Sequence, residues 1–121
     1  MHFRDLEVYK RSYKLALAMH EVSFTLPKSL QYDLGDQLRR ASRSIPANIA
    51  EGCGRYKSSK DTINFLRTAL GSNYEVAFNL EFCMDAKLLK KDVAERFLKE
   101  YEILGKQLTV LIKSIQPSTI N

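Results

Sequence analysis

Apolar residues recur three and four positions apart along almost the whole chain. This spacing places them on one face of an α-helix, so it predicts helices rather than strands. The interruptions divide the chain into four helical segments and leave no room for a convincing strand. We expect these helices at about residues 5–24, 29–52, 58–85 and 91–115.

Prolines and one capping pattern set the expected helix ends. Pro27 should end the first helix, because the residue before a proline disfavours the helical conformation. Ser58 and Asp61 fit a capping box that begins the third helix. Pro117 should stop the fourth helix. The short connections between the segments favour antiparallel neighbours, so we predict an all-α, up-down four-helix bundle in one domain, 1–121.

The first helix carries two apolar stripes on nearly opposite sides. We assign Leu6, Tyr9, Tyr13, Ala16, Leu17, His20 and Phe24 to the core. A monomeric bundle needs one stripe per helix, so the other stripe indicates burial against further subunits. In the fourth helix, a core stripe runs from Val93 to Ile115, and two apolar residues lie off it. The expected interface of a homo-oligomer is therefore Val8, Leu15, Met19, Val22, Ile103 and Val110.

The second helix contains a proline but keeps its apolar phase. Leu38, Ile45 and Ile49 share one face, so we predict a continuous helix that is kinked at Pro46, with the carbonyl of Ser42 released. Asn48 falls within the apolar arc and needs hydrogen-bond partners. The freed backbone near the kink and Asn73 are the candidates. Gly52 and Gly54 suit a helix end, where positive φ favours glycine.

The same helix carries a family resemblance. Residues 37–41, QLRRA, residues 44–52, SIPANIAEG, and Gly54-Arg55 resemble the hallmark of the proteins encoded within intervening sequences of bacterial 23S ribosomal RNA. These are also called four helix bundle proteins. Residues 3–9, FRDLEVY, and 65–75, FLRTALGSNYE, resemble further parts of that family, with Tyr9 where Trp is expected. The resemblance covers nearly the whole chain.

The resemblance implies an up-down four-helix bundle that assembles into a ring, a homopentamer. The family is similar to the accessory protein of diversity-generating retroelements, a basic pentameric barrel associated with reverse transcriptase and nucleic acid. The family itself supplies no settled biochemical activity. A role as a nucleic-acid-associated accessory protein is therefore what the resemblance implies.

The charge of the chain is uneven. Residues 1–60 carry 11 Lys and Arg against 6 Asp and Glu, a net +5, while residues 61–121 carry 8 of each. Because Arg39 and Arg43 project away from the apolar face, we predict that they bind nucleic-acid phosphates. Arg55, Lys57 and Lys60, with Tyr56 among them, form a secondary set. Arg40 is expected to form a structural ion pair with Glu51, and Asp36 or Glu75 could also pair with the arginines, within or between subunits. A merely solvated basic surface is the alternative.

Catalytic chemistry is poorly supported by the sequence. His20 is expected in the core or an interface rather than as a ligand, and no metal-site spacing is present. We expect no cofactor and no enzyme activity. Cys53 and Cys83 should be free thiols, and the charged start and lack of a long apolar run favour a cytoplasmic protein without membrane contact. Two hypotheses remain, a homo-oligomer that binds RNA or DNA and an oligomeric scaffold that binds a protein.

Overall fold

The structure is a computed structural model that describes residues 2–116, and it contains four long α-helices. The first, α1, is preceded by a short 3₁₀-helix at Phe3–Asp5, and a second 3₁₀-helix at Lys28–Leu30 precedes α2. The predicted helix positions are confirmed to within a few residues, and most closely for the last two helices. The bounds are α1 Glu7–Ser23, α2 Leu34–Gly54, α3 Ser59–Asp85 and α4 Lys91–Ile115.

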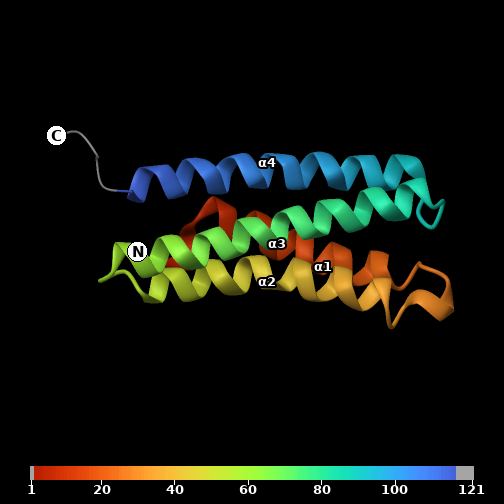
Figure 1. Cartoon of the computed structure of the whole chain (residues 1–121), viewed down its shortest axis with the longest axis horizontal. Coiled ribbons are helices and arrows are strands. Elements are labelled where there is room, and N and C mark those ends of the chain that lie inside the picture. The colour runs from red at the N-terminus through yellow and green to blue at the C-terminus, as the bar shows by residue number, and fades with distance from the viewer. Residues whose placement is uncertain (1, 117–121) are drawn as a thin grey trace.

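Consecutive helices are antiparallel neighbours, as the short connections predicted (Figure 1). Helix α2 packs against α1 and α3, and α3 also packs against α4. Helices α1 and α4 close the bundle with a smaller contact. The α2–α3 turn lies at the same end of the bundle as the start of the chain, and the other two connections lie at the opposite end (Figure 1). Helices α1 and α3 therefore occupy diagonal positions.

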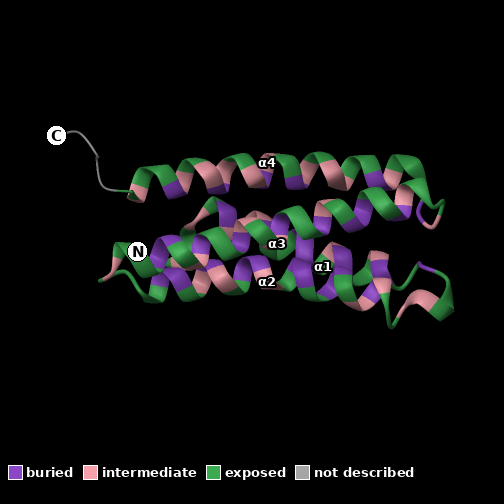
Figure 2. Cartoon of the chain, in the orientation of Figure 1, coloured by how far each residue is buried: buried purple, intermediate pink, exposed green. Residues whose placement is uncertain are grey.

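The two stripes of α1 agree with the prediction only in part, because Ala16 is buried and Leu6 and Tyr9 pack against the core as expected, while the other assignments are wrong. Val8, Leu15 and Met19, which were assigned to a subunit interface, are buried in the core of their own bundle. Along each helix of the bundle, buried positions alternate with exposed ones (Figure 2). Val22 is half-buried and packs against the same core. The predicted core residues Tyr13, Leu17, His20 and Phe24 are exposed instead. Val8, Leu15 and Met19 therefore cannot form a surface on this chain.

The burial of Ser12 explains why the sequence pattern placed the core on the wrong side of α1. Positions 8, 12, 15, 19, 22 and 26 follow the alternating spacing of four and three residues that marks a helix seam. Ser12 occupies one of these positions, is fully buried, and donates a hydrogen bond from its hydroxyl to the carbonyl of Tyr9 at 3.1 Å. This local bond satisfies the hydroxyl without a partner on another helix. A polar residue thus interrupted the apolar pattern at a core position.

Helix α2 continues through Pro46, which confirms the predicted continuity, and Leu38, Ile45 and Ile49 are fully buried. The kink at Pro46 stays a prediction. Pro46 is itself buried. The expectation of a positive φ at Gly52 or Gly54 is wrong, because no described glycine has a positive φ and the left-handed conformation occurs at Lys87, φ 61°. Gly52 is required for a different reason. A Cβ there would lie 3.1 Å from the Cβ of Phe65 and 3.3 Å from the carbonyl oxygen of Thr62, so glycine lets α2 and α3 approach closely.

Helices α3 and α4 follow the predicted pattern more closely. Ser58 caps α3, because its hydroxyl accepts a hydrogen bond from the backbone N–H of Asp61 at 3.2 Å. In α4, Tyr101, Leu104 and Leu108 are fully buried, as expected. The helix ends at Ile115, and Pro117 lies outside the described residues. Within residues 2–116, no helix is both long enough and apolar enough to cross a membrane.

Candidate nucleic-acid interface

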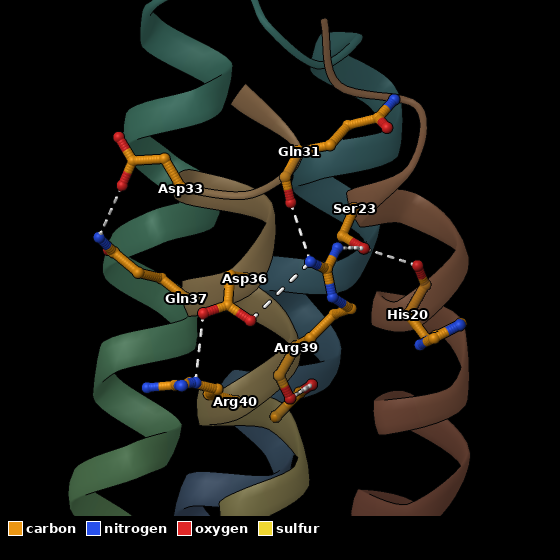
Figure 3. Close-up of polar contacts among 9 residues, drawn as sticks. His20, Ser23, Gln31, Asp33, Asp36, Gln37, Arg39 and Arg40 are labelled. Atoms are coloured by element: carbon orange, nitrogen blue, oxygen red, sulfur yellow. Dashed lines mark hydrogen bonds and ion pairs between the residues drawn. The ribbon is translucent and has the colours of Figure 1, made fainter. Parts of the chain in front are cut away.

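Arg39 is a structural residue rather than a solvent-facing one, which corrects the prediction. Only 9% of the residue is exposed. Its Nη1 donates to the hydroxyl of Ser23 at 2.8 Å, and its Nη2 donates to the carbonyl oxygen of Gln31 at 2.9 Å (Figure 3). The guanidinium carbon also lies 4.5 Å from the centroid of the Phe24 ring. Arg39 therefore joins the end of α1 and the α1–α2 connection to α2.

The surroundings of Arg39 are built to hold it. Gly35 leaves space, because a Cβ at that position would lie 3.2 Å from Nη1 of Arg39 and 3.2 Å from the carbonyl oxygen of Ser23. The Asp36 carboxylate lies 3.9 Å from Nη2 of Arg39 and 3.2 Å from Nε of Arg40 (Figure 3). Arg40 thus forms the structural ion pair that was expected, with Asp36 rather than Glu51. Glu51 is exposed.

Arg43 lies one turn further along α2 and is exposed. It lines an apolar hollow of about 530 Å³ between α1 and α2. The aromatic and aliphatic side chains of α1 form one wall, and small residues of α2 form the other. The lining includes Tyr13, Leu17, His20, Pro46, Ala47 and Ala50. Arg43 is therefore a cation on the wall of an apolar groove.

The predicted secondary set gathers at the α2–α3 turn. Arg55, Lys57 and Lys60 are all exposed, and Tyr56 among them is exposed as well. Arg55 approaches the Phe65 ring, with its guanidinium carbon 5.6 Å from the ring centroid. Among the described residues, none of the three cations lies in an ion pair, in contrast to Arg40. These side chains are free to bind an anion.

The turn has a fixed position because α2 and α3 are joined at several points. The hydroxyl of Thr62 donates to the carbonyl oxygens of Gly52 at 2.9 Å and of Arg55 at 3.1 Å. Further along, Asn48 donates to the carbonyl and hydroxyl oxygens of Ser44 at 2.8 and 2.9 Å, and Ser72 donates to the same hydroxyl at 2.9 Å. Asn48 thus donates to the backbone near Pro46, at the carbonyl of Ser44, as one prediction had it, and not to Asn73. A Cβ at Gly54 would meet nothing within 4 Å, so no contact requires that glycine.

His20, Cys53 and Cys83 differ in exposure. His20 is exposed and packs on Phe24, with the ring centroids 5.3 Å apart, so its predicted core position is wrong. Burial raises the pKa of the Cys53 and Cys83 thiols and so disfavours the nucleophilic thiolate. Within residues 2–116, no group of three or more His, Cys, Asp or Glu side chains is arranged to hold a metal ion.

Sequence reasoning missed one surface feature. Tyr74, Phe78 and Phe82 stand on the outer side of α3 and are 65%, 67% and 48% exposed. Their spacing of four residues was a usable signal, because it runs on the side opposite the buried Val76, Leu80 and Cys83.

These features define a four-helix bundle that has a basic turn and two exposed apolar surfaces. The sequence pattern of the 23S rRNA-intervening sequence protein family matches residues 4–110. The chain therefore belongs to that family, as its resemblance implied.

A solved structure supports the same assignment. The chain is similar to a protein of unknown function from the S23 ribosomal protein family of Bacteroides thetaiotaomicron VPI-5482, with 25% sequence identity and a TM-score of 0.81. The similarity covers 88% of this chain and 98% of the other. A search of the curated proteins finds no similar protein.

Proposed function

We propose that the protein is a non-enzymatic, homo-oligomeric accessory protein that binds nucleic-acid phosphates through its α2–α3 turn. The supporting observation is the cluster of Arg55, Lys57 and Lys60, exposed and without ion-pair partners among the described residues. Arginine and lysine side chains neutralise phosphates, and the exposed Tyr56 offers a ring on which a base can stack. Two of the residues that the sequence predicted to bind phosphates are not part of this site. Arg39 is engaged in contacts within the fold, and Arg43 lines the apolar groove.

One copy of the turn makes a weak binding site. Residues 51–61 carry three cations, Arg55, Lys57 and Lys60, and two carboxylates, Glu51 and Asp61, which leaves a net charge of +1. An oligomer repeats the turn and holds the copies at fixed separations. Simultaneous contacts then raise the apparent affinity without any new contact in a single subunit. Binding through several turns at once requires the assembly.

Exposed apolar side chains on two helices support self-association. Tyr13 and Leu17 of α1 and Phe78 of α3 are exposed in a single copy. Contiguous apolar surface of this kind marks contact sites. Val110, an interface candidate from the sequence, is also exposed, and Ile103 is half-buried. We propose the pentameric ring that the family resemblance implies, and a cytoplasmic location in keeping with two free cysteines.

An oligomeric protein scaffold without a nucleic-acid role is the second candidate. The exposed aromatic side chains of α3 favour it, because a protein partner would cover them. The two candidates differ in their response to salt. Phosphate binding releases counterions and weakens steeply as salt rises, whereas binding through apolar surface does not.

A titration of the purified protein with structured RNA and with duplex DNA at two salt concentrations tests the proposal. We expect binding that weakens with salt and shows little base preference. Replacing Arg55, Lys57 and Lys60 together with Ala should lower the affinity and flatten the salt dependence without changing the oligomer mass.

The matched control replaces Lys28, Lys90 and Lys91 with Ala. These exposed lysines lie in or beside the two connections at the opposite end of the bundle (Figure 1). The control variant therefore loses three positive charges, as the turn variant does, but away from the α2–α3 turn. The control variant should bind RNA and DNA more tightly than the variant that lacks Arg55, Lys57 and Lys60. A parent protein that binds neither nucleic acid at low salt overturns the proposal and favours the scaffold. Equal losses in the two variants overturn the assignment to the turn.

A further inference from the structure

The two exposed apolar surfaces differ in shape. The groove is the hollow of about 530 Å³ between α1 and α2, and its floor on the α2 side consists of the small or compact residues Pro46, Ala47 and Ala50. The ridge is the row of Tyr74, Phe78 and Phe82 on α3, which lie four residues apart and therefore along one side of the helix. The rings of Phe78 and Phe82 have centroids 6.5 Å apart. The groove is concave, whereas the ridge side chains are largely exposed, and Tyr74 at one end of the ridge also borders a hollow of about 720 Å³ towards α4.

The charges that border the two surfaces are opposite in sign. Glu75, Glu81 and Asp85 lie on the ridge side of α3 at helical spacing, all are exposed, and none forms an ion pair with a described residue. From residue 74 to residue 86 there is no lysine or arginine. The charged residues that line the groove are Arg39 and Arg43, both cationic. Arg39 is engaged within the fold, which leaves Arg43 to meet a carboxylate.

The two surfaces also face different ways. Helices α1 and α3 are diagonal in the bundle, so their outer sides point away from each other. A chain cannot place its own ridge in its own groove. Two different surfaces that meet between copies make a head-to-tail contact, which repeats until it closes into a ring or extends as a filament.

We propose that the ridge of one copy docks in the groove of the next, with Arg43 facing the acidic border of the ridge. This proposal rests on the homo-oligomer of the proposed function and names the surfaces that form it. It assigns Arg43 to the contact between copies and leaves the α2–α3 turn for phosphates. The occupant of the groove is a second copy of this chain, because the shape and the charge of the ridge both match the groove.

Two variants of the full chain test the pairing by light scattering without nucleic acid. Phe78→Glu breaks the ridge and keeps the groove, while Leu17→Glu breaks the groove and keeps the ridge. Each alone should have a mass near the 13.9 kDa of one chain. When the two are mixed, the intact groove of one can still receive the intact ridge of the other. The mixture should therefore contain a species of twice 13.9 kDa that grows no further, because both of its free surfaces are broken.

Controls separate this outcome from misfolding and from the proposed function. Tyr32→Glu places the same charge at another exposed aromatic residue and should keep the parent mass, and circular dichroism should show equal helix content in all variants. The proposal is overturned if either variant alone keeps the parent mass, or if the mixture stays at the mass of one chain. A parent that is oligomeric but fails to bind RNA contradicts only the nucleic-acid role. A parent that binds RNA as a single chain contradicts only the docking.

Discussion

The two ends of α2 carry similar cations but use them in opposite ways. At the N-terminal end, Arg39 is buried and its guanidinium contacts Ser23, Gln31 and Asp36. At the C-terminal end, Arg55 and its neighbours are exposed and lie in no ion pair among the described residues. One end of the helix therefore uses its charge for the fold, and the other end presents its charge to solvent.

The difference depends on which acceptors are within reach. A guanidinium at the end of a long side chain can bend toward a neighbouring connection when carbonyl and hydroxyl oxygens are present there. The α1–α2 connection supplies these oxygens, and Gly35 leaves room for the side chain. The α2–α3 turn uses its own carbonyl oxygens for Thr62. The direction of a residue on a helical wheel therefore does not determine whether its charge is available.

The largest expected effect is at Arg39. Arg39→Met leaves the carbonyl of Gln31 and the hydroxyl of Ser23 without their charged donor, so it should lower the free energy of unfolding by about 2 kcal/mol. Thermal or denaturant unfolding measures this loss. Arg39→Lys should recover only part of it, because one ammonium group does not reproduce the planar fork. Arg43→Met is the control, and a similar loss there would remove the distinction between the two arginines.

The next effect is at the C-terminal end, in the packing that fixes the turn. Gly52→Ala should lower the free energy of unfolding by about 1–2 kcal/mol, because its methyl group would press on Phe65 and on the carbonyl of Thr62. Gly54→Ala is the matched change two residues away, with open space around it, and should be neutral or stabilising. Urea denaturation of both variants makes the comparison. Equal effects would show that the close approach of α2 and α3 is not needed.

A smaller effect is expected at the start of α3. Ser58→Ala removes the hydroxyl that caps Asp61, at a cost of about 1 kcal/mol in the free energy of unfolding. Ser58→Asp should retain most of the stability, since a carboxylate also accepts this bond. Loss of stability in both variants would indicate that the hydroxyl acts in some other way.

The smallest effect is at Arg40. Its side chain is 75% exposed, and its ion pair with Asp36 at 3.2 Å spans one helical turn. Such pairs contribute about 0.3–0.5 kcal/mol, so Arg40→Ala should change stability by little more than the error of a denaturation curve. If Arg40→Ala lowered the free energy of unfolding as much as Arg39→Met does, Asp36 would depend on Arg40 for its contact with Arg39.

The sequence predicted the helices well because their signals are local. The Ser58 hydroxyl caps α3 at Asp61 as the spacing indicated, although the Ser58 N–H bonds to Arg55 rather than to the Asp61 carboxylate that a full capping box uses. The alternation of Tyr101, Leu104 and Leu108 located the buried side of α4. The continuity of α2 across Pro46 followed from Ile45 and Ile49 remaining in phase.

The candidate site was predicted less well because it depends on contacts between elements. Nothing near Arg39 in the sequence indicates that the carbonyl of Gln31 and the hydroxyl of Ser23 turn toward it. Likewise, the buried Ser12 hid the true core side of α1. Arg55, Lys57 and Lys60 were placed correctly on the surface because a turn at the end of a bundle exposes its side chains. Whether they bind phosphates remains a prediction.

We predict that the cations at the two ends of α2 serve different purposes: Arg39 stabilises the fold, whereas Arg55, which directly follows Gly54, binds phosphates. This difference is tested most directly by the anisotropy of a labelled RNA across a salt series, with Arg39→Met and Arg55→Met compared at a temperature where both are folded. We predict that Arg55→Met weakens binding and makes the dependence of log K on log salt less steep, while Arg39→Met leaves both unchanged. The account would be contradicted if Arg39→Met bound RNA more weakly and with a less steep dependence of log K on log salt, while Arg55→Met bound RNA as the parent does.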